Sequence, residues 1–105
     1  MLEEIYERAL QYELELKGYK ISHQVSIPIK YKGHQLYTDD EPCKLRLDLL
    51  VDDCVIIELK SVTVLDKIHF KQLTSYLKLL NMKVGVLLNF NAKVIMPDGF
   101  GRVVV

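Results

Sequence analysis

The sequence places two carboxylates and a lysine in segments that are otherwise apolar. Asp48 lies in the run 46–51 (Arg-Leu-Asp-Leu-Leu-Val), and Glu58 and Lys60 lie in the run 55–60 (Val-Ile-Ile-Glu-Leu-Lys). Charged side chains in buried strands cost free energy unless they are paired or bound to a metal. An Asp and a Glu that converge beside a lysine suit a divalent cation with a nearby positive charge. A divalent cation with a nearby positive charge can catalyse hydrolysis of a phosphodiester.

The two runs predict a hairpin around Asp52 and Asp53. Because Glu58 and Lys60 are two residues apart, their side chains project from the same face of a strand. Directly opposed residues of an antiparallel pair also share a face, with Cβ atoms about 5 Å apart. The loop length therefore decides which residue faces Asp48.

A two-residue loop would set Asp48 opposite Ile57, on the wrong face. A loop of residues 52–54 sets Asp48 opposite Glu58 instead. If these residues form a site, we expect the three-residue loop, or a bulge with the same effect.

Residues 2–17 predict a helix, because apolar side chains recur at helical spacing and Gly18 is suited to its C-cap. At 100° per residue Glu13 falls in the middle of the apolar stripe, and Glu3 falls at its edge. A carboxylate on the buried side needs a partner. Glu13 is therefore either a metal ligand or an orienting group, or it forms a cap or a salt bridge to a strand lysine.

Residues 65–80 predict a second helix, with Asp66 favourable near its N-terminus. Gln72 falls inside the apolar stripe, one turn before Tyr76. A buried glutamine needs hydrogen bonds. Either Gln72 and Tyr76 orient the carboxylates or touch a phosphate, or the glutamine binds strand backbone. The stripe itself contains Leu65, Ile68, Tyr76 and Leu79.

The remaining strands complete a mixed sheet with helices packed on it, in the order α-β-β-β-β-α-β-β. The fold class is α/β, of the α+β type. Pro28 places the first strand at an edge or a bulge, and the apolar run 83–90 is typical of a central strand. We expect strands at 19–31, from 36, at 83–90 and at 102–105, a turn at 32–34, loops at 39–42 and 91–101, and a short strand around 94–96.

Length and charge limit the classes of function. The chain has 105 residues, half of them apolar, which predicts one domain with a real core. Its net charge is zero, whereas nucleic-acid-binding proteins usually carry a basic footprint. Residues 17–38 nevertheless contain four lysines and two histidines but no acid. They form either a basic patch beside an acidic metal site or an ordinary solvated hairpin.

Two cysteines, Cys43 and Cys54, lack zinc-ligand spacing. We expect reduced thiols and a cytoplasmic protein, since the sequence has no recognisable signal peptide. No apolar run approaches the roughly 20 residues of a membrane helix, so no membrane partner is expected.

The spacing of these residues resembles the PD-(D/E)XK nuclease superfamily. Its core motif is an Asp, a hairpin, and then (Asp/Glu)-x-Lys, which Asp48 and Glu58-Leu59-Lys60 match. Leu47 stands where many members have proline. The run 72–76 is similar to the QxxxY element of the recombination-type branch. The resemblance implies a restriction-endonuclease-like core.

More closely, the chain resembles the small GxxExxY proteins of that superfamily. The motif's glycine would fall just before Met1, so residues 1–105 are expected to be one nuclease-like domain that is short at its N-terminus. The matching stretches are 3–6, 12–14, 31–33, the two motif strands, 69–73 and 86–90.

This resemblance implies a mechanism. Asp48, Glu58 and the Leu59 carbonyl would bind Mg²⁺ or Mn²⁺, and Glu3 would help directly or through water. Lys60 would position or deprotonate the attacking water and stabilise the developing charge. In the same scheme, Gln72 and Tyr76 would orient the site.

Three functions remain open at this point. The first is a metal-dependent nuclease acting on DNA, for which a domain this small could bind a duplex as a homodimer. The second is a non-catalytic relative that binds nucleic acid or a protein. In the third, Asp48, Glu58 and Lys60 form a buried salt-bridge network. An open cavity at these residues favours the enzyme, and sealing by Arg46 or a lysine favours the network.

Overall fold

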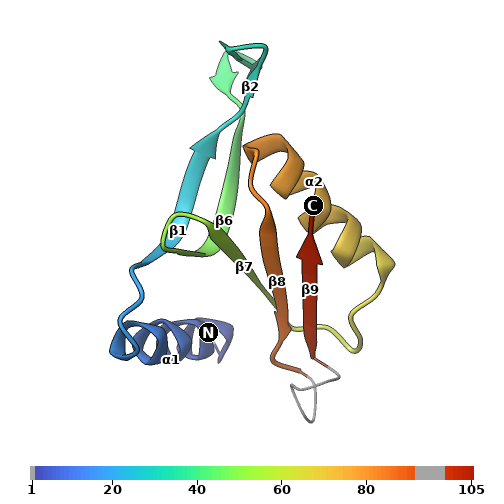
Figure 1. Cartoon of the computed structure of the whole chain (residues 1–105). Coiled ribbons are helices and arrows are strands. Elements are labelled where there is room, and N and C mark those ends of the chain that lie inside the picture. The colour runs from blue at the N-terminus through green and yellow to red at the C-terminus, as the bar shows by residue number, and fades with distance from the viewer. Residues whose placement is uncertain (1, 92–98) are drawn as a thin grey trace.

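A five-stranded mixed sheet and two helices form the body of the protein, as the sequence predicts (Figure 1). The computed structural model describes residues 2–91 and 99–105. Adjacent strands are antiparallel except β7 and β8, which are parallel and joined through α2. The sheet order is β1 (Ile21–Pro28), β6 (Lys44–Val51), β7 (Val55–Lys60), β8 (Val84–Asn89) and β9 (Phe100–Val104).

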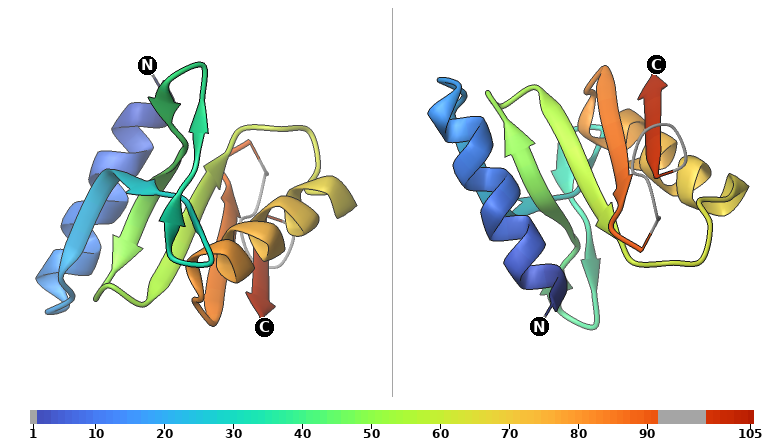
Figure 2. Two further views of the ribbon diagram at one scale, coloured as in Figure 1. Left: turned by 90° about the horizontal axis from the view of Figure 1, so that it is seen from above. Right: turned by 90° about the horizontal axis from the view of Figure 1, so that it is seen from below.

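The helices α1 (Leu2–Leu16) and α2 (Lys67–Leu80) cover opposite faces of the sheet (Figure 2). Two apolar clusters result, because alternate residues of a strand face opposite sides. Leu49, Val51 and Ile57 form the cluster on the α1 side. The larger cluster on the α2 side contains Leu47, Leu50, Ile56, Leu73, Leu77 and Leu87.

Helix α2 begins and ends at well-defined caps. The Asp66 carboxylate accepts from the Ile68 N–H at 2.9 Å, and the Asp66 N–H donates to His69 Nδ1 at 3.0 Å. Asn81 ends the helix in the left-handed conformation that suits a C-cap. The predicted apolar stripe is wrong in part: Leu73 and Leu77 are buried, whereas Ile68 and Leu79 are 67% and 55% exposed.

The first helix buries a different acid from the one predicted. Glu13 is exposed, and Glu7 is the acid of α1 that is buried, at 7% exposure. Leu10 and Leu14 pack against the sheet. The side of the helix that contacts the sheet therefore includes Glu7 and not Glu13.

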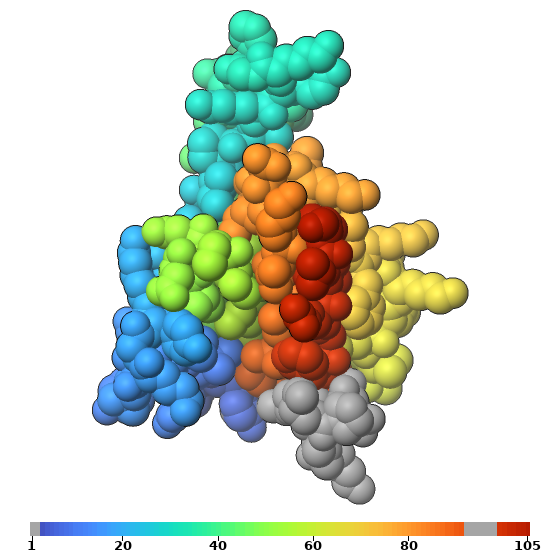
Figure 3. All heavy atoms as spheres, viewed as in Figure 1, coloured from blue at the N-terminus to red at the C-terminus, as the bar shows by residue number. Residues whose placement is uncertain are grey.

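Residues 29–43 form an arm that stands clear of the body (Figure 3). They replace the simple turn and returning strand that the sequence predicts. The arm contains two short hairpins, β2 (Lys30–Tyr31) with β3 (His34–Gln35) and β4 (Tyr37–Thr38) with β5 (Glu41–Pro42). The predicted edge position of the strand ending at Pro28 is confirmed.

The base of the arm is closed by a ring of backbone hydrogen bonds. Ile29 donates to Cys43, Cys43 donates to Leu36, and Leu36 donates to Ile29, at 2.8–3.0 Å. The Gln35 amide Nε2 donates to the same three carbonyls at 2.9–3.1 Å. This junction fixes how both hairpins leave the sheet.

The short strand predicted around 94–96 lies outside the described residues. Among the described helices, neither is long and apolar enough to cross a membrane.

Helix α2 approaches the sheet closely at Gly85 and Gly101. A substitution at Gly101 tests this packing more sharply. A Cβ added there would lie 2.5 Å from the Phe70 ring. We expect Gly101→Ala to lower the free energy of unfolding by about 1–3 kcal/mol, because a packed core resists an extra carbon. Urea denaturation measures this change.

A second variant separates overpacking from other causes. Adding Phe70→Leu to Gly101→Ala should restore part of the lost stability, since the shorter side chain gives the new methyl room. Additive effects of the two substitutions would contradict this packing.

Candidate active site

The β6–β7 hairpin has the three-residue loop that a shared site requires. Val51 pairs with Val55, so residues 52–54 lie outside the ladder. Asp52 and Asp53 both have positive φ, and the Cys54 N–H donates to the Val51 carbonyl at 2.9 Å. The predicted register is therefore confirmed over the paired residues.

The paired ladder ends at Leu49 and Ile57, and the next pair in that register is Asp48 with Glu58. Here side chains replace backbone partners. The Leu59 N–H donates to Asp48 Oδ2 at 2.8 Å, and the Asp48 N–H donates to Glu58 Oε1 at 3.4 Å. Both carboxylates are consequently held at the place where the two strands separate.

Glu58 is buried, with 8% of its surface exposed. Burial, and after it the negative charge of Asp48, raise the pKa of its carboxyl group to about 7. The Asp48 N–H and the Lys60 cation lower the pKa of Glu58 but do not offset these two causes. The surroundings of Glu58 thus disfavour its charged form when no cation is bound.

Lys60 belongs to a chain of hydrogen bonds that runs from β7 to α2. Its ammonium donates to Gln72 Oε1 at 3.2 Å, and Gln72 Nε2 donates to the Tyr76 hydroxyl at 3.1 Å. The structure thus brings together the three residues that the sequence singled out. Gln72 is exposed, however, which corrects its predicted place inside the apolar stripe.

Tyr76 lies close enough to the carboxylates to feel their charge. Burial raises the pKa of its hydroxyl, and Glu58 and Asp48 raise it further. The phenol therefore stays protonated, so its hydroxyl can both accept from Gln72 and donate to another group.

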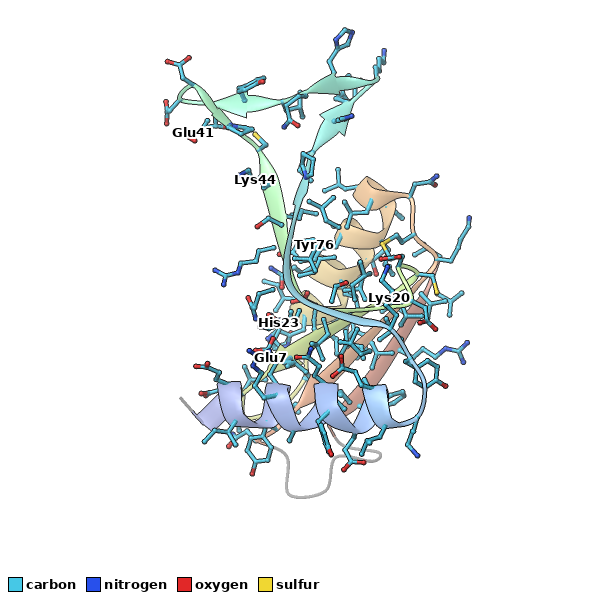
Figure 4. All side chains as sticks on the ribbon, turned by 90° about the vertical axis from the view of Figure 1, so that its left-hand side faces the viewer. Glu7, Lys20, His23, Glu41, Lys44 and Tyr76 are labelled. Atoms are coloured by element: carbon cyan, nitrogen blue, oxygen red, sulfur yellow. The ribbon has the colours of Figure 1, made fainter. Side chains whose placement is uncertain are left out.

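An open hollow of about 590 Å³ lies between α1 and the hairpin. Asp48 and Leu59 form part of its wall, while Glu58 is buried behind it. Figure 4 labels two of its lining residues, Glu7 on the side of α1 that faces the sheet and His23 next to it. The wall also contains Glu3, Arg8, Gln24 and Arg46.

Within the described part of the chain, neither carboxylate is sealed by a cation. Among the described residues, no lysine or arginine forms an ion pair within 4.0 Å of Asp48 or Glu58. Arg46 lies on the wall of the hollow and is exposed. A buried salt-bridge network therefore does not account for these two acids.

The donors at the hairpin fit a hard divalent cation. Asp48, Glu58 and the Leu59 carbonyl would supply oxygen ligands, which Mg²⁺ and Mn²⁺ prefer. Glu3 lies on the same hollow, and the hydrogen bond to its own backbone is the largest cause that lowers its pKa. Within the part of the chain that the structure describes, no three His, Cys, Asp or Glu side chains cluster tightly enough to form a metal site alone.

Two residues near the site were missed by sequence reasoning. Glu7 shows no signal beyond helical spacing, and Gln24 lies in a strand pattern that looks regular. The Gln24 amide donates to Glu7 Oε1 at 2.7 Å.

Asn89 was a third omission, although a polar residue in an apolar strand is a usable signal. It is 1% exposed. Its side chain exchanges two hydrogen bonds with the Val62 backbone, at 3.0 and 2.8 Å. Asn89 thus fixes the segment that directly follows Lys60.

The next residue, Phe90, fixes the first turn of α1. Its ring stacks on the Tyr6 ring with centroids 4.8 Å apart. The stack ties the residue after β8 to the first two turns of α1, which carry Glu3 and Glu7.

Comparison with known proteins gives one match. A family model described as the PD-(D/E)XK nuclease superfamily matches residues 1–103. No curated protein and no solved structure matches the chain significantly.

The raised pKa of Glu58 makes the stability of the metal-free protein depend on pH. The folded pKa of about 7 exceeds the ordinary value of 4.5, so between these values the folded state keeps a proton that the unfolded state has lost. The free energy of unfolding must then fall as pH rises through this window. A shift of this size corresponds to about 3 kcal/mol.

Glu58→Gln should remove this dependence, because glutamine does not titrate. In EDTA, we expect the variant to gain about 2–3 kcal/mol relative to wild type between about pH 5 and about pH 8. Urea denaturation across this range measures the difference in free energy of unfolding. The histidines are present in both proteins, so their contributions cancel in this difference. Parallel pH curves would contradict the raised pKa.

Proposed function

The chain belongs to the PD-(D/E)XK nuclease superfamily, and we propose that it is a metal-dependent nuclease that hydrolyses phosphodiester bonds of DNA. One observation carries the proposal. A buried glutamate with a raised pKa lies next to Asp48, which forms part of the wall of an open hollow, and no described lysine or arginine forms an ion pair with either acid. Such a site favours a bound cation and gives a substrate access to it.

Members of this superfamily typically use divalent metals, and we propose Mg²⁺ or Mn²⁺ here. Asp48, Glu58 and the Leu59 carbonyl would hold the ion, with Glu3 acting through water from the first turn of α1. A bound divalent ion supplies a Lewis acid and a water whose pKa falls from 15.7 toward neutrality.

Lys60 is proposed as the residue that acts on the attacking water. Its ammonium is held toward α2 by Gln72, which is in turn bonded to Tyr76. The ammonium carries three N–H donors, so one can stay bonded to Gln72 while another orients a water or stabilises charge on the phosphate. Gln72 and Tyr76 therefore restrict the positions that the ammonium can take.

The hollow also contains basic side chains suited to a phosphate backbone. Arg8, His23 and Arg46 lie on its wall beside Asp48. Arginine binds phosphate through paired N–H groups. We propose that these side chains hold the strand whose phosphodiester reaches Asp48. Assignment to the GxxExxY branch and a homodimer on duplex DNA stay predictions.

Cleavage assays test the nuclease. With Mg²⁺ or Mn²⁺, wild type should cut labelled single-stranded, duplex or branched DNA. Asp48→Asn and Lys60→Ala should each lower the rate by about 10²–10⁴-fold, because each removes a group that acts on the reacting atoms.

Matched variants control for surface charge. Asp40→Asn lies in an exposed turn of the arm, and Lys67→Ala lies in the exposed first turn of α2. Both should cleave as wild type does. A folded wild type that cuts none of the substrates, or a Lys60→Ala variant at the wild-type rate, would contradict the proposal.

A second candidate function, a non-catalytic nucleic-acid-binding module, is favoured by the arm. Its first hairpin carries Lys30, Lys32 and His34 beside Tyr31, which is exposed. The Lys32 ammonium lies 5.4 Å from the centre of the Tyr31 ring. Exposed aromatic and basic side chains of this kind bind single strands by stacking and charge.

Fluorescence anisotropy at several salt concentrations tests the arm. Lys30→Ala with Tyr31→Ala should weaken single-strand binding about 10-fold or more, since stacking on one base contributes about 1–3 kcal/mol. Lys83→Ala, an exposed lysine just before β8, is the control. Equal affinities in all three proteins would show that the arm does not contact the strand.

A further inference from the structure

Strand β1 is interrupted at one residue. Gln24 has φ of +51°, a left-handed conformation that is unfavourable for residues other than glycine. On either side of it, His23 pairs with Leu49 and Val25 pairs with Leu47. The missing pair of this register is Gln24 with Asp48.

The hydrogen bonds of the β1–β6 ladder change phase across this gap. At one end, the Asp52 N–H donates to the Lys20 carbonyl at 2.8 Å; at the other, the Ile29 N–H donates to Cys43 at 2.8 Å. Bonded pairs of an antiparallel ladder recur at every second residue. Lys20 is an even position and Ile29 an odd one, so the phase must change between them.

The side chains change faces at the same place. Ile21 packs in the cluster on the α1 side, whereas Val25 and Ile27 pack in the cluster on the α2 side. In β6, Leu49 lies on the α1 side and Leu47 on the α2 side. Residues two apart share a face in a regular strand, so both strands turn over at the Gln24–Asp48 position.

This turnover sets the geometry of Asp48. Its N–H contacts Glu58 Oε1 on the β7 side at 3.4 Å, and its carboxylate accepts the Leu59 N–H at 2.8 Å. In a continuous ladder of the phase seen at Lys20, the Asp48 N–H would instead face β1. The contacts between the two acidic residues therefore depend on the turn at Gln24.

Gln24 is anchored from the other side of the hollow. Its amide Nε2 donates to Glu7 Oε1 at 2.7 Å, and Glu7 is buried at 7% exposure. Figure 4 shows Glu7 between α1 and the sheet, next to His23. A left-handed residue persists where its surroundings enforce it.

We propose that Gln24 and Glu7 are positioning residues that hold Asp48 in the turned conformation, so that docking of α1 completes the site. The inference deepens the proposed function and rests on it for its metal and DNA readouts. The pair acts through Asp48 and touches neither the reacting phosphate nor the metal.

Four variants test the pair. Gln24→Gly keeps a residue that accepts positive φ but removes the anchor. Glu7→Ala removes the acceptor, whereas Glu7→Gln keeps an oxygen that Gln24 can donate to. Ser26→Gly, at an exposed position of β1, controls for a glycine in the strand.

The first readout needs neither metal nor activity. Hydrogen exchange of the Leu59 amide, followed by NMR, reports its bond to Asp48. Gln24→Gly and Glu7→Ala should speed this exchange about 10-fold, while Ser26→Gly and Glu7→Gln should leave it near the wild-type rate.

The second readout is Mn²⁺ affinity by titration calorimetry, with DNA cleavage beside it. Gln24→Gly and Glu7→Ala should weaken Mn²⁺ binding about 10–100-fold and lower kcat, with KM for DNA little changed. Glu7→Gln should keep the Mn²⁺ affinity and kcat near their wild-type values. A merely structural role would not weaken Mn²⁺ binding and lower kcat while leaving the KM for DNA unchanged.

The outcomes separate the two proposals. If Gln24→Gly and Glu7→Ala both show the Leu59 exchange rate and the Mn²⁺ affinity of Ser26→Gly, the positioning role of the pair is overturned. Glu7→Gln as impaired as Glu7→Ala would also overturn it, by making the charge of Glu7 the active feature. A wild type that binds no Mn²⁺ and cuts no DNA would contradict the nuclease, and the exchange rates would still decide on the pair.

Discussion

The hydrogen bond from the Leu59 amide to the Asp48 carboxylate stands where the β6–β7 ladder ends. It keeps Asp48 beside the buried Glu58, whose pKa burial and the neighbouring charge raise to about 7. Two acids this close are unfavourable in a sheet unless something offsets their repulsion. The rest of the structure can be understood as what holds this arrangement in place and leaves it open on one side.

Each helix controls one side of that arrangement. On the α2 side, Gln72 accepts a hydrogen bond from the Lys60 ammonium and donates one to the Tyr76 hydroxyl. On the α1 side, Glu7 anchors the left-handed residue opposite Asp48, and the Tyr6–Phe90 stack holds the same helix turn. Because the two helices lie on opposite faces of the sheet, the site is complete only when both are docked.

Much of this could be predicted from sequence, for identifiable reasons. The α+β class and the hairpin register follow from a strand period of two and a three-residue loop. The buried faces of the helices were predicted less well. Glu13 and Gln72 were expected on the buried side but are exposed, because spacing alone does not say which edge of a helix meets the sheet. Gln24 could not be found, since one left-handed residue leaves no mark in an alternating pattern. The two hairpins of the arm depend on Gln35, whose three backbone contacts are equally invisible in sequence.

We propose that Asp48 and Glu58 together hold a divalent cation, and anomalous diffraction from crystals soaked in Mn²⁺ would show this ion. We expect one strong peak at the end of the β6–β7 ladder, with oxygens of both carboxylates and of Leu59 at about 2.0–2.5 Å. An empty position there in crystals that bind Mn²⁺ elsewhere, or the Lys60 ammonium bound directly between the two carboxylates, would exclude this cation site.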